Sequence, residues 1–458
     1  MHIWWIRRDL RLGDNDALAA ALQENSGVVP VFILDPKLLD RPAEKRQAFL
    51  FEGLRALDDE LRKLGSYLIV RRGDPVAELT HLVAETGAGA VYAEADVTPY
   101  AMRRDAAVAR EVDLRLVEGS SFYPPMAVRQ ANGRPYKVFT AYSRVWRALP
   151  FNDQALPAPE FLSPIPDLPT EHIPDSVWHP GIKPGETEAK RLLRAFLDGP
   201  IYAYRETRDR MDLDGTSRLS AFLRFGMLSI RQAVVAVMHA VENAPDEDAR
   251  RSCDTWLNEL IWREFYRSIL YHFPDVLKTT FRSGMRAIPW RNAPSDLRAW
   301  QNGQTGYPVV DAGMRQMAVT GWMHNRARMI TASFLVKHLL INWQTGERWF
   351  MQQLIDGDPA SNNGGWQWVA GTGTDAAPYF RIFNPVLQGK KYDPMGDYVR
   401  RWVPELTGVP GRFIHSPWEM TEGEQNACGV VIGSDYPAPV VEHVFARRRA
   451  LAAYQRQA

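Results

Sequence analysis

The stretch Val28–Leu34 reads VVPVFIL, an apolar and largely β-branched run of strand length. Residues 44–64 follow it, and apolar side chains such as Leu54 and Leu57 recur there at intervals of three and four, the spacing of one helical face. Similar runs of strand character lie at residues 3–6, 67–70, 90–93 and 114–117. Strands that alternate with helices build a parallel sheet covered on both faces, so we predict a doubly wound, Rossmann-like α/β domain over residues 1–130.

The rest of the chain has a different pattern. Nine of the 32 prolines lie between Pro150 and Pro184, a density that excludes regular helix and central strand. We therefore predict a long extended linker over residues 131–186. From residue 187 the pattern is almost wholly helical, with loops punctuated by glycine and proline, and we predict an all-α domain over residues 187–458.

The composition excludes several classes of protein. Lys plus Arg is 55 and Asp plus Glu is 54, a net charge of +1, so a nucleic-acid site has to be a local basic patch. The two cysteines, Cys253 and Cys428, are too few for an iron–sulfur cluster or a four-thiolate zinc site, and we predict no metal. No apolar stretch is long enough to span a bilayer, and no secretory signal or coiled-coil heptad is recognisable. We therefore predict a cytoplasmic monomer with no membrane contact.

Tryptophan is concentrated in the helical part, where nine of the 15 tryptophans lie within residues 256–368. In the stretch that begins at Trp256, Glu259 shares one helical stripe with aromatic side chains. A carboxylate there is costly unless it is partnered or protonated, which makes Glu259 a candidate functional acid. The alternative is a plain ion pair of Glu259 or Glu264 with a neighbouring arginine such as Arg263 on a solvated face.

Residues 214–220 combine groups that suit a phosphate. A glycine and three hydroxyls precede a predicted helix over residues 221–225, and the free N–H groups of a helix start bind anions. The plainer alternative is an N-cap by Thr216 or Ser217.

Another stretch places two arginines in a helical segment. Arg326 and Arg328 suit contacts with phosphate groups. Ion pairs with carboxylates such as Asp356 or Asp358 explain them equally well. His324, in the same stretch, is more often a structural histidine than a ligand.

The densest cluster reads DGDPASNNGGWQW, residues 356–368, and GTGTD follows at residues 371–375. Its glycine placement and the missing terminal glutamate exclude an EF-hand calcium loop. A turn rich in glycine and asparagine, with Trp366 and Trp368 at alternate positions, suits close approach of the backbone to a flat ligand. We predict a ligand-binding loop here.

Together these motifs resemble the DNA photolyase/cryptochrome family, most closely the bacterial class I cyclobutane pyrimidine dimer photolyases. The resemblance covers nearly the whole chain and rests on residues 7–11, 215–220, 256–266, 305–308, 322–329, 362–368 and 374–381. It implies an N-terminal antenna domain, a linker and a helical domain that binds FAD, which acts in its reduced form FADH−.

The resemblance also implies the residues of the FAD pocket. These are Tyr204, Thr216, Ser217, Arg218, Leu219, Ser220, Trp256, Glu259, Arg263, Asn325, Arg328, Asp356, Asp358 and Asn362. Arg328 would pair with Asp356, and Asn362 would lie beside flavin N5.

The implied activity is light-driven repair of cyclobutane pyrimidine dimers in UV-damaged DNA. The dimer is flipped out of the duplex and receives an electron from photoexcited reduced FAD. Glu259 and Asn325 would hydrogen-bond the pyrimidine carbonyls, and Asn362 and Met329 complete the implied catalytic set. Trp262 and Trp368 would pack on the damaged bases. The implied contacts to DNA and lesion are Arg208, Glu259, Trp262, Arg263, Asn325, Arg326, Trp368 and Arg381.

A second set of tryptophans matches the chain that re-reduces oxidised flavin from the protein surface in this family. These residues are Trp366, Trp343 and Trp300. A third group is predicted to consist of packing residues: Trp4, Trp5, Trp146, Trp178, Trp402 and Trp418.

The N-terminal domain is expected to hold an antenna chromophore. Asp35 and Asp96 resemble sites for 8-hydroxy-5-deazaflavin or FMN. Methenyltetrahydrofolate is disfavoured because Tyr100 and Ala101 stand where folate-binding relatives carry an Asn-Glu pair.

Two alternative functions belong to the same family. One is a cryptochrome-like blue-light photoreceptor, and the other is repair of the (6-4) photoproduct. Asn362, Trp262 and Met329 fit dimer repair. Repair of the (6-4) photoproduct is disfavoured because relatives with that activity carry histidines where Asn325 and Met329 stand.

Overall fold

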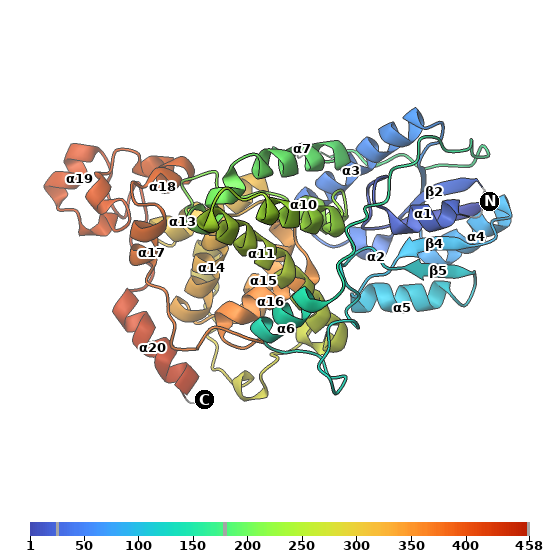
Figure 1. Ribbon diagram of the computed structural model, residues 1–458. Helices are drawn as coiled ribbons and strands as arrows, with labels where there is room; N and C mark the ends of the chain where they lie inside the picture. Colours follow the sequence, from blue (N-terminus) through green and yellow to red (C-terminus); the bar gives the residue numbers. More distant parts are fainter. Residues whose placement is uncertain (24–26, 177–180, 456–458) are drawn as a thin grey trace. The chain divides into compact units, whose positions relative to one another are not determined.

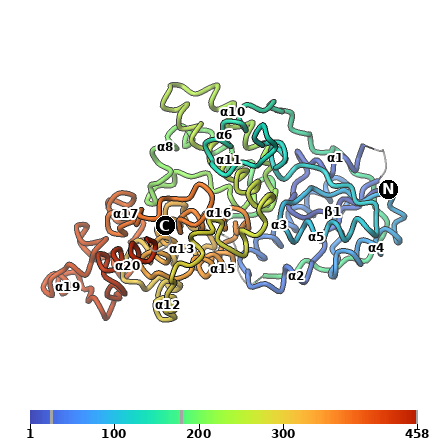
Figure 2. Tube along the Cα trace, turned by 90° about the horizontal axis from the view of Figure 1, so that it is seen from below, coloured from blue at the N-terminus to red at the C-terminus, as the bar shows by residue number. Residues whose placement is uncertain are grey.

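A computed structural model describes residues 1–23, 27–176 and 181–455 of the chain. Trp178 therefore lies outside the described residues, as do residues 177–180 of the predicted linker. The chain forms two compact units, which Figures 1 and 2 show coloured along the sequence. Unit 1 consists of residues 1–205, 216–274 and 355–360, and unit 2 consists of residues 206–215, 275–354 and 361–458.

Unit 1 contains one sheet of five parallel strands in the order β3-β2-β1-β4-β5, which confirms the doubly wound prediction (Figure 1). The strands are β1 (His2–Ile6), β2 (Val28–Leu34), β3 (Ile69–Arg72), β4 (Val91–Glu94) and β5 (Leu114–Val117). Every residue of β1 and β2 is buried, as expected for inner strands covered on both faces. β3 begins two residues later than predicted, because the N–H of Leu68 donates to Asp58 of α3 instead of to a neighbouring strand.

The helices between these strands begin at good N-caps. Asn15, Asp74 and Thr98 each accept a hydrogen bond from a backbone N–H of the first helical turn. These helices are α1 (Asp16–Leu22), α2 (Pro36–Leu39), α3 (Glu44–Lys63), α4 (Pro75–Thr86) and α5 (Pro99–Val108). Helix α1 packs across β1, β4 and β5, and α4 packs beside α5.

The remaining helices of unit 1 follow in sequence. They are α6 (Phe139–Ala148), α7 (Glu186–Leu197), α8 (Tyr204–Thr207), which runs on into unit 2, α9 (Ser220–Phe225), α10 (Ile230–Glu242) and α11 (Glu247–His272). Helix α11 packs against α10 and α6. The described part of the range predicted as an extended linker thus contains helix α6 and the first residue of α7, whereas residues 151–176 form neither helix nor strand, as the prolines predict.

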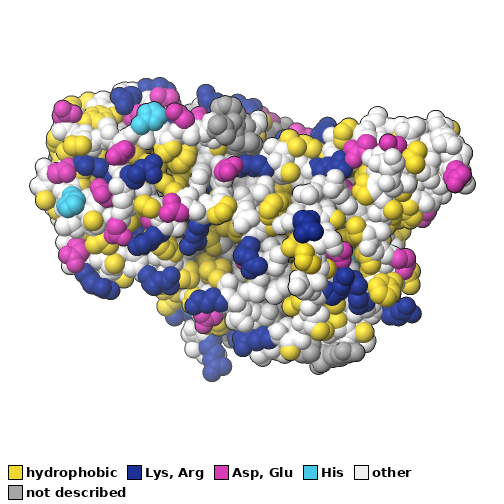
Figure 3. All heavy atoms as spheres, turned by 180° about the vertical axis from the view of Figure 1, so that it is seen from behind, with side chains coloured by type: hydrophobic (Ala, Val, Ile, Leu, Met, Phe, Trp, Pro, Cys, Tyr) yellow, Lys and Arg dark blue, Asp and Glu magenta, His cyan; other side chains and the backbone are white. Residues whose placement is uncertain are grey.

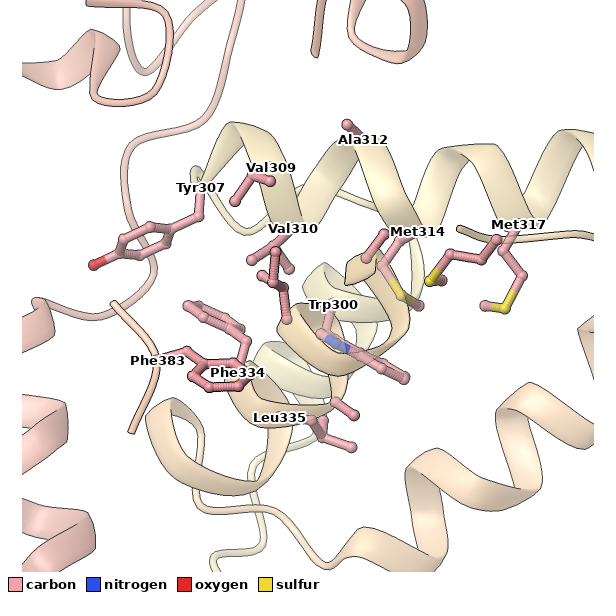
Figure 4. Close-up of a cluster of buried hydrophobic side chains, with 14 of the residues drawn as sticks. Trp300, Tyr307, Val309, Val310, Ala312, Met314, Met317, Phe334, Leu335 and Phe383 are labelled. Carbon is pink, nitrogen blue, oxygen red and sulfur yellow. The ribbon is translucent and has the colours of Figure 1, made fainter. Parts of the chain in front are cut away.

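Unit 2 is helical, as predicted. Its helices are α12 (Pro294–Gln301), α13 (Pro308–Thr320), α14 (Asn325–Ser333), a π-helical segment η4 (Phe334–His338), α15 (Trp343–Gln353), α16 (Pro359–Ala370), α17 (Pro385–Tyr392), α18 (Asp397–Trp402), α19 (Glu422–Cys428) and α20 (His443–Gln455). The first two residues of α16 belong to unit 1. The hydrophobic core of unit 2 includes Trp300, Val310, Met314 and Leu335, whose side chains lie close together in Figure 4. None of the helices in the described ranges is long and apolar enough to cross a membrane.

Candidate active site

The residues predicted for the site divide between the two units. Unit 1 holds Tyr204, Thr216, Ser217, Arg218, Leu219, Ser220, Trp256, Glu259, Trp262, Arg263, Asp356 and Asp358. Unit 2 holds Arg208, Trp300, Asn325, Arg326, Arg328, Met329, Trp343, Asn362, Trp366, Trp368 and Arg381. The predicted pair of Arg328 with Asp356 joins residues of different units and stays a prediction.

One side of α11 carries Trp256, Glu259 and Trp262. Trp256 is buried and packs on Phe196 of α7, with ring centroids 5.1 Å apart. Trp262 stacks flat on Phe139 of α6, with centroids 3.8 Å apart and planes 4° from parallel. Glu259 is partly exposed. Because Phe139 covers one face of the Trp262 indole, another aromatic ring has to approach from a different side.

Phe139 was missed by the sequence prediction. It lies in the range assigned to the linker, 123 residues from Trp262. The signal that could have found it is the recurrence of Phe139, Tyr142 and Trp146 at helical spacing, since Tyr142 and Trp146 are buried on α6.

The neighbouring acid, Glu264, has a structural role. It is 2% exposed and binds Arg263 at 2.8 Å and the N–H of Phe122 at 2.8 Å. Burial and the neighbouring Arg267 together lower the pKa of Arg263 to about 10, although Glu264 opposes the shift. The ion-pair alternative is therefore confirmed for Glu264, but the pair is buried instead of lying on a solvated face. Glu259, not Glu264, stays the candidate functional acid.

The alternative that Thr216 or Ser217 is the N-cap of α9 is wrong. Leu219 is the N-cap residue of α9, and no side chain caps the helix, so neither Thr216 nor Ser217 does. Arg218 has a φ of 54°, an uncommon conformation for a residue other than glycine. No hydrogen bond joins the hydroxyl groups of Thr216, Ser217 or Ser220 to any residue in the described ranges. These hydroxyls are available to a polar ligand.

Asp358 belongs to a charged cluster of unit 1. Arg8 binds Asp358 at 2.6 Å and approaches Asp96 at 3.4 Å. Arg224 donates to the carbonyl of Gly357 at 2.9 Å. Burial, and after it the charge of Arg8, lower the pKa of Arg224 to about 9. The cluster fixes the 355–360 segment onto the turn that follows β1.

Helix α14 carries the second group of predicted residues. His324 caps it, because its Nδ1 accepts from the N–H of Arg326 at 3.1 Å, so the structural interpretation of this histidine is confirmed. Arg326 forms an ion pair with Asp209 at 2.6 Å, a carboxylate of the same unit that the sequence analysis did not name. Met329 packs against the core of unit 2.

The segment predicted as a ligand-binding loop is mostly helical, since α16 spans Pro359–Ala370. Pro359 suits a helix start, and the side chain of Asp358 accepts from the N–H of Ala360 at 3.0 Å. Two asparagines hold α16 to α15: the Asn362 amide donates to the carbonyl of Glu347 at 3.1 Å, and Asn363 donates to the Glu347 carboxyl at 2.8 Å. Burial raises the pKa of Glu347 to about 7.

The three predicted electron-transfer tryptophans lie in the core of unit 2. Trp366 contacts Trp300, with ring centroids 6.1 Å apart, and Trp343 is 1% exposed. Trp300 is 0% exposed and donates to the carbonyl of Thr331, so it cannot be the surface end of a chain. Trp290, which is only partly buried against the same cluster, was missed by the sequence prediction.

The remaining predicted side chains lie nearer the surface. Trp368 is partly buried against the core of unit 2. Arg381 is exposed, with its guanidinium 5.7 Å from the Phe383 ring centroid. In unit 1, Tyr204 is buried and packs on Phe196.

The two predicted antenna residues have partners within unit 1. Asp35 accepts from the N–H of Lys37 at the start of α2 and from the hydroxyl of Tyr100. Burial alone would raise the pKa of Asp96, but Arg8 and other cations hold it well below its usual range. No group of three or more His, Cys, Asp or Glu side chains within the described ranges is suited to a metal ion.

Comparisons with known proteins identify the family of the chain. The family model for DNA photolyase matches residues 2–160, and the model for the FAD binding domain of DNA photolyase matches residues 256–456. The deoxyribodipyrimidine photo-lyases of Agrobacterium fabrum and Escherichia coli are 41% and 42% identical to the chain, covering 99% of it and 97% and 98% of their own lengths.

Solved structures give the same result. A bacterial class III photolyase from Agrobacterium tumefaciens matches with a TM-score of 0.93 and 38% identity, covering 99% of this chain and 97% of that one. A Synechocystis cryptochrome matches with a TM-score of 0.91 and 29% identity, covering 99% of both chains. The chain therefore belongs to the DNA photolyase family, and its C-terminal part contains that family's FAD-binding domain.

Proposed function

We propose that this chain repairs cyclobutane pyrimidine dimers in UV-damaged DNA with light. The observation that carries the proposal is the flat stack of Trp262 on Phe139 beside Glu259. A supported indole is a rigid platform for a flipped base, and stacking of this kind contributes about 1–3 kcal/mol per base. Glu259 is one helical turn away and would hydrogen-bond a pyrimidine carbonyl.

The residues of the predicted FAD pocket suit such a ligand. The hydroxyls of Thr216, Ser217 and Ser220 have no bonding partner in the described ranges and suit a diphosphate. The amide of Asn362 is held by α15, which would fix its orientation toward the flavin ring. Reduced FAD, when bound, would supply the electron that light transfers to the dimer. The assignment of the chain to class I of the family rests on the sequence motifs alone.

The proposed DNA contacts are individual arginines. Figure 3 shows Lys and Arg side chains scattered over one face of the molecule among acidic ones, in keeping with a net charge of +1. We propose Arg208, Arg263, Arg326 and Arg381 as phosphate contacts, for a monomer acting on DNA in the cytoplasm. Such contacts weaken steeply with salt.

Two finer assignments are also proposals. An antenna chromophore, 8-hydroxy-5-deazaflavin or FMN, would bind near Asp35 and Asp96. Electrons would reach Trp366 through Trp343 from the partly exposed Trp290, which replaces Trp300 as the outer donor.

The deciding experiment is repair of a thymine dimer in an oligonucleotide. With flavin pre-reduced, blue light should restore the intact thymines and darkness should not. The restored thymines are measured by chromatography of the digested strand. If the protein binds the lesion but light does not restore the thymines, the photoreceptor alternative is favoured. Repair of an oligonucleotide with a (6-4) photoproduct, but not of the thymine dimer, would favour the (6-4) photolyase alternative.

Replacing Glu259 by glutamine should lower the repair yield while flavin stays bound. The amide keeps the size of the side chain but donates a weaker hydrogen bond than a protonated carboxyl to the charge developing on the dimer, so the loss should be smaller than the about 2–4 kcal/mol that removal of a whole donor costs in other sites. Repair per absorbed photon and flavin absorbance measure the two effects. The same type of change at Asp254, to asparagine, serves as the control, because Asp254 is exposed and pairs with Arg147. An unchanged yield in Glu259→Gln would remove Glu259 from the catalytic set.

A further inference from the structure

Two of the arginines proposed to contact phosphates share one acidic partner within unit 2. Both carboxylate oxygens of Asp209 face Arg326: Nη2 lies 2.6 Å from Oδ2, and Nε lies 3.3 Å from Oδ1. Arg208 lies beside the same carboxylate, with its Nε 4.0 Å from Oδ1. One negative charge thus serves two guanidinium groups.

The remaining surroundings of Arg326 hold it in this arrangement. Its guanidinium carbon lies 4.3 Å from the ring centroid of Tyr392, at the end of α17. The turn that carries Asp209 is bonded to the same point, because the N–H of Met211 donates to the carbonyl of Tyr392 at 2.9 Å. Asp209 and Arg326 are therefore positioned by the fold, and Asp209 is still 29% exposed at its side chain.

A carboxylate and a phosphate compete for the same part of an arginine. The Nε–Nη2 edge forms two parallel hydrogen bonds with either anion. In Arg326 that edge is occupied by Asp209, and the face of the guanidinium is covered by Tyr392. A backbone phosphate that bound this edge would have to displace the carboxylate.

We propose that Asp209 is an internal counter-ion that a DNA phosphate displaces from Arg326 and Arg208, so that it limits the affinity of the protein for the DNA backbone. The proposal rests on the DNA-repair function proposed above. Replacing Asp209 by a neutral side chain would remove one negative charge from the neighbourhood of both arginines. DNA binding releases counter-ions in proportion to the charges engaged, so Asp209 also limits the salt dependence of binding.

The test is the variant Asp209→Asn, which removes the charge and keeps a side-chain oxygen that accepts from Arg326. The dissociation constant is measured for a thymine-dimer duplex and for the undamaged duplex over a series of salt concentrations. We expect both duplexes to bind about two- to fivefold more tightly, the range for a partly exposed charge pair. The slope of log K against log salt should steepen by about one. The repair yield per bound dimer should not change.

Asp212→Asn is the matched control, because Asp212 makes its own pair with Arg210 at 2.5 Å and loses the same charge. Its binding should change less than that of Asp209→Asn. Unchanged or weaker binding in Asp209→Asn would overturn the proposal and make Asp209 a positioning residue only. If the asparagine variant fails to fold, Asp209→Ser tests the same charge. Failure of the unsubstituted protein to bind or repair damaged DNA would instead contradict the proposed function.

Discussion

Replacing Trp366 by phenylalanine should slow light-driven reduction of bound flavin by about tenfold or more, a change equal to about 1.4 kcal/mol in a barrier. The indole is 2% exposed and lies against Trp300 and Phe350, with ring centroids 6.1 and 4.9 Å away. Gly346 packs so closely that a Cβ there would lie 2.1 Å from the Trp366 ring. An indole enclosed in this way can serve packing or electron transfer, and phenylalanine preserves most of the packing.

The measurement is the loss of oxidised-flavin absorbance under blue light with an external reductant. Repair by flavin reduced beforehand with dithionite should proceed at the normal yield, because that reaction needs no electron from the protein surface. Trp402→Phe, a partly buried tryptophan of the same unit, is the control. Loss of repair by pre-reduced Trp366→Phe protein would refute the separation of the two functions.

Replacing Gly226 by alanine should destabilise the protein by roughly 3 kcal/mol or more, the range for combined backbone strain and overpacking. Gly226 ends α9 with a φ of 64°. A Cβ there would lie 1.9 Å from the carbonyl oxygen of Arg8 and 2.8 Å from Cα of Asp9, and neither backbone atom can rotate away. The turn after β1 would have to move, and with it the contact of Arg8 with Asp358.

Urea unfolding measures this effect, and Gly87→Ala is the matched control. Gly87 also ends a helix with a φ of 62°, but nothing lies within 4 Å of the position that a Cβ would take there. Its substitution should cost only the conformational penalty of about 1 kcal/mol. If both variants lose the same free energy of unfolding, the close approach of Gly226 to Arg8 contributes nothing to the destabilisation.

The sequence predicts those elements whose signal is local. The bounds of β2 are predicted to the residue because an apolar run buried on both faces has no competing pattern. The predicted start of β3 is wrong because Asp58, ten residues away, takes the N–H of Leu68. The prediction of a loop over α16 is also wrong. Glycine and asparagine have low helix propensity, but Asp358 supports the helix start and the packing of Trp366 offsets that cost.

The site shows the same limit. Helical spacing makes Glu259 of α11 a candidate functional acid. It cannot show that Glu264 is structural, because the partner of Glu264, Phe122, lies 142 residues away in the sequence. Nor can it show that Trp300 is enclosed, because burial depends on α14 and α15 packing around it. Long-range contacts of this kind decide roles that a pattern of residue types leaves open.

The division of the chain into units has a consequence for synthesis on the ribosome. The unit that contains the N-terminal sheet is completed only by residues 355–360, where Asp358 binds Arg8 near the end of β1. At about 5–20 residues per second, the ribosome reaches that segment roughly 20–70 s after it starts. Until then Arg8 lacks this carboxylate partner, so this ion pair of unit 1 forms only after the strands of its sheet have long left the ribosome.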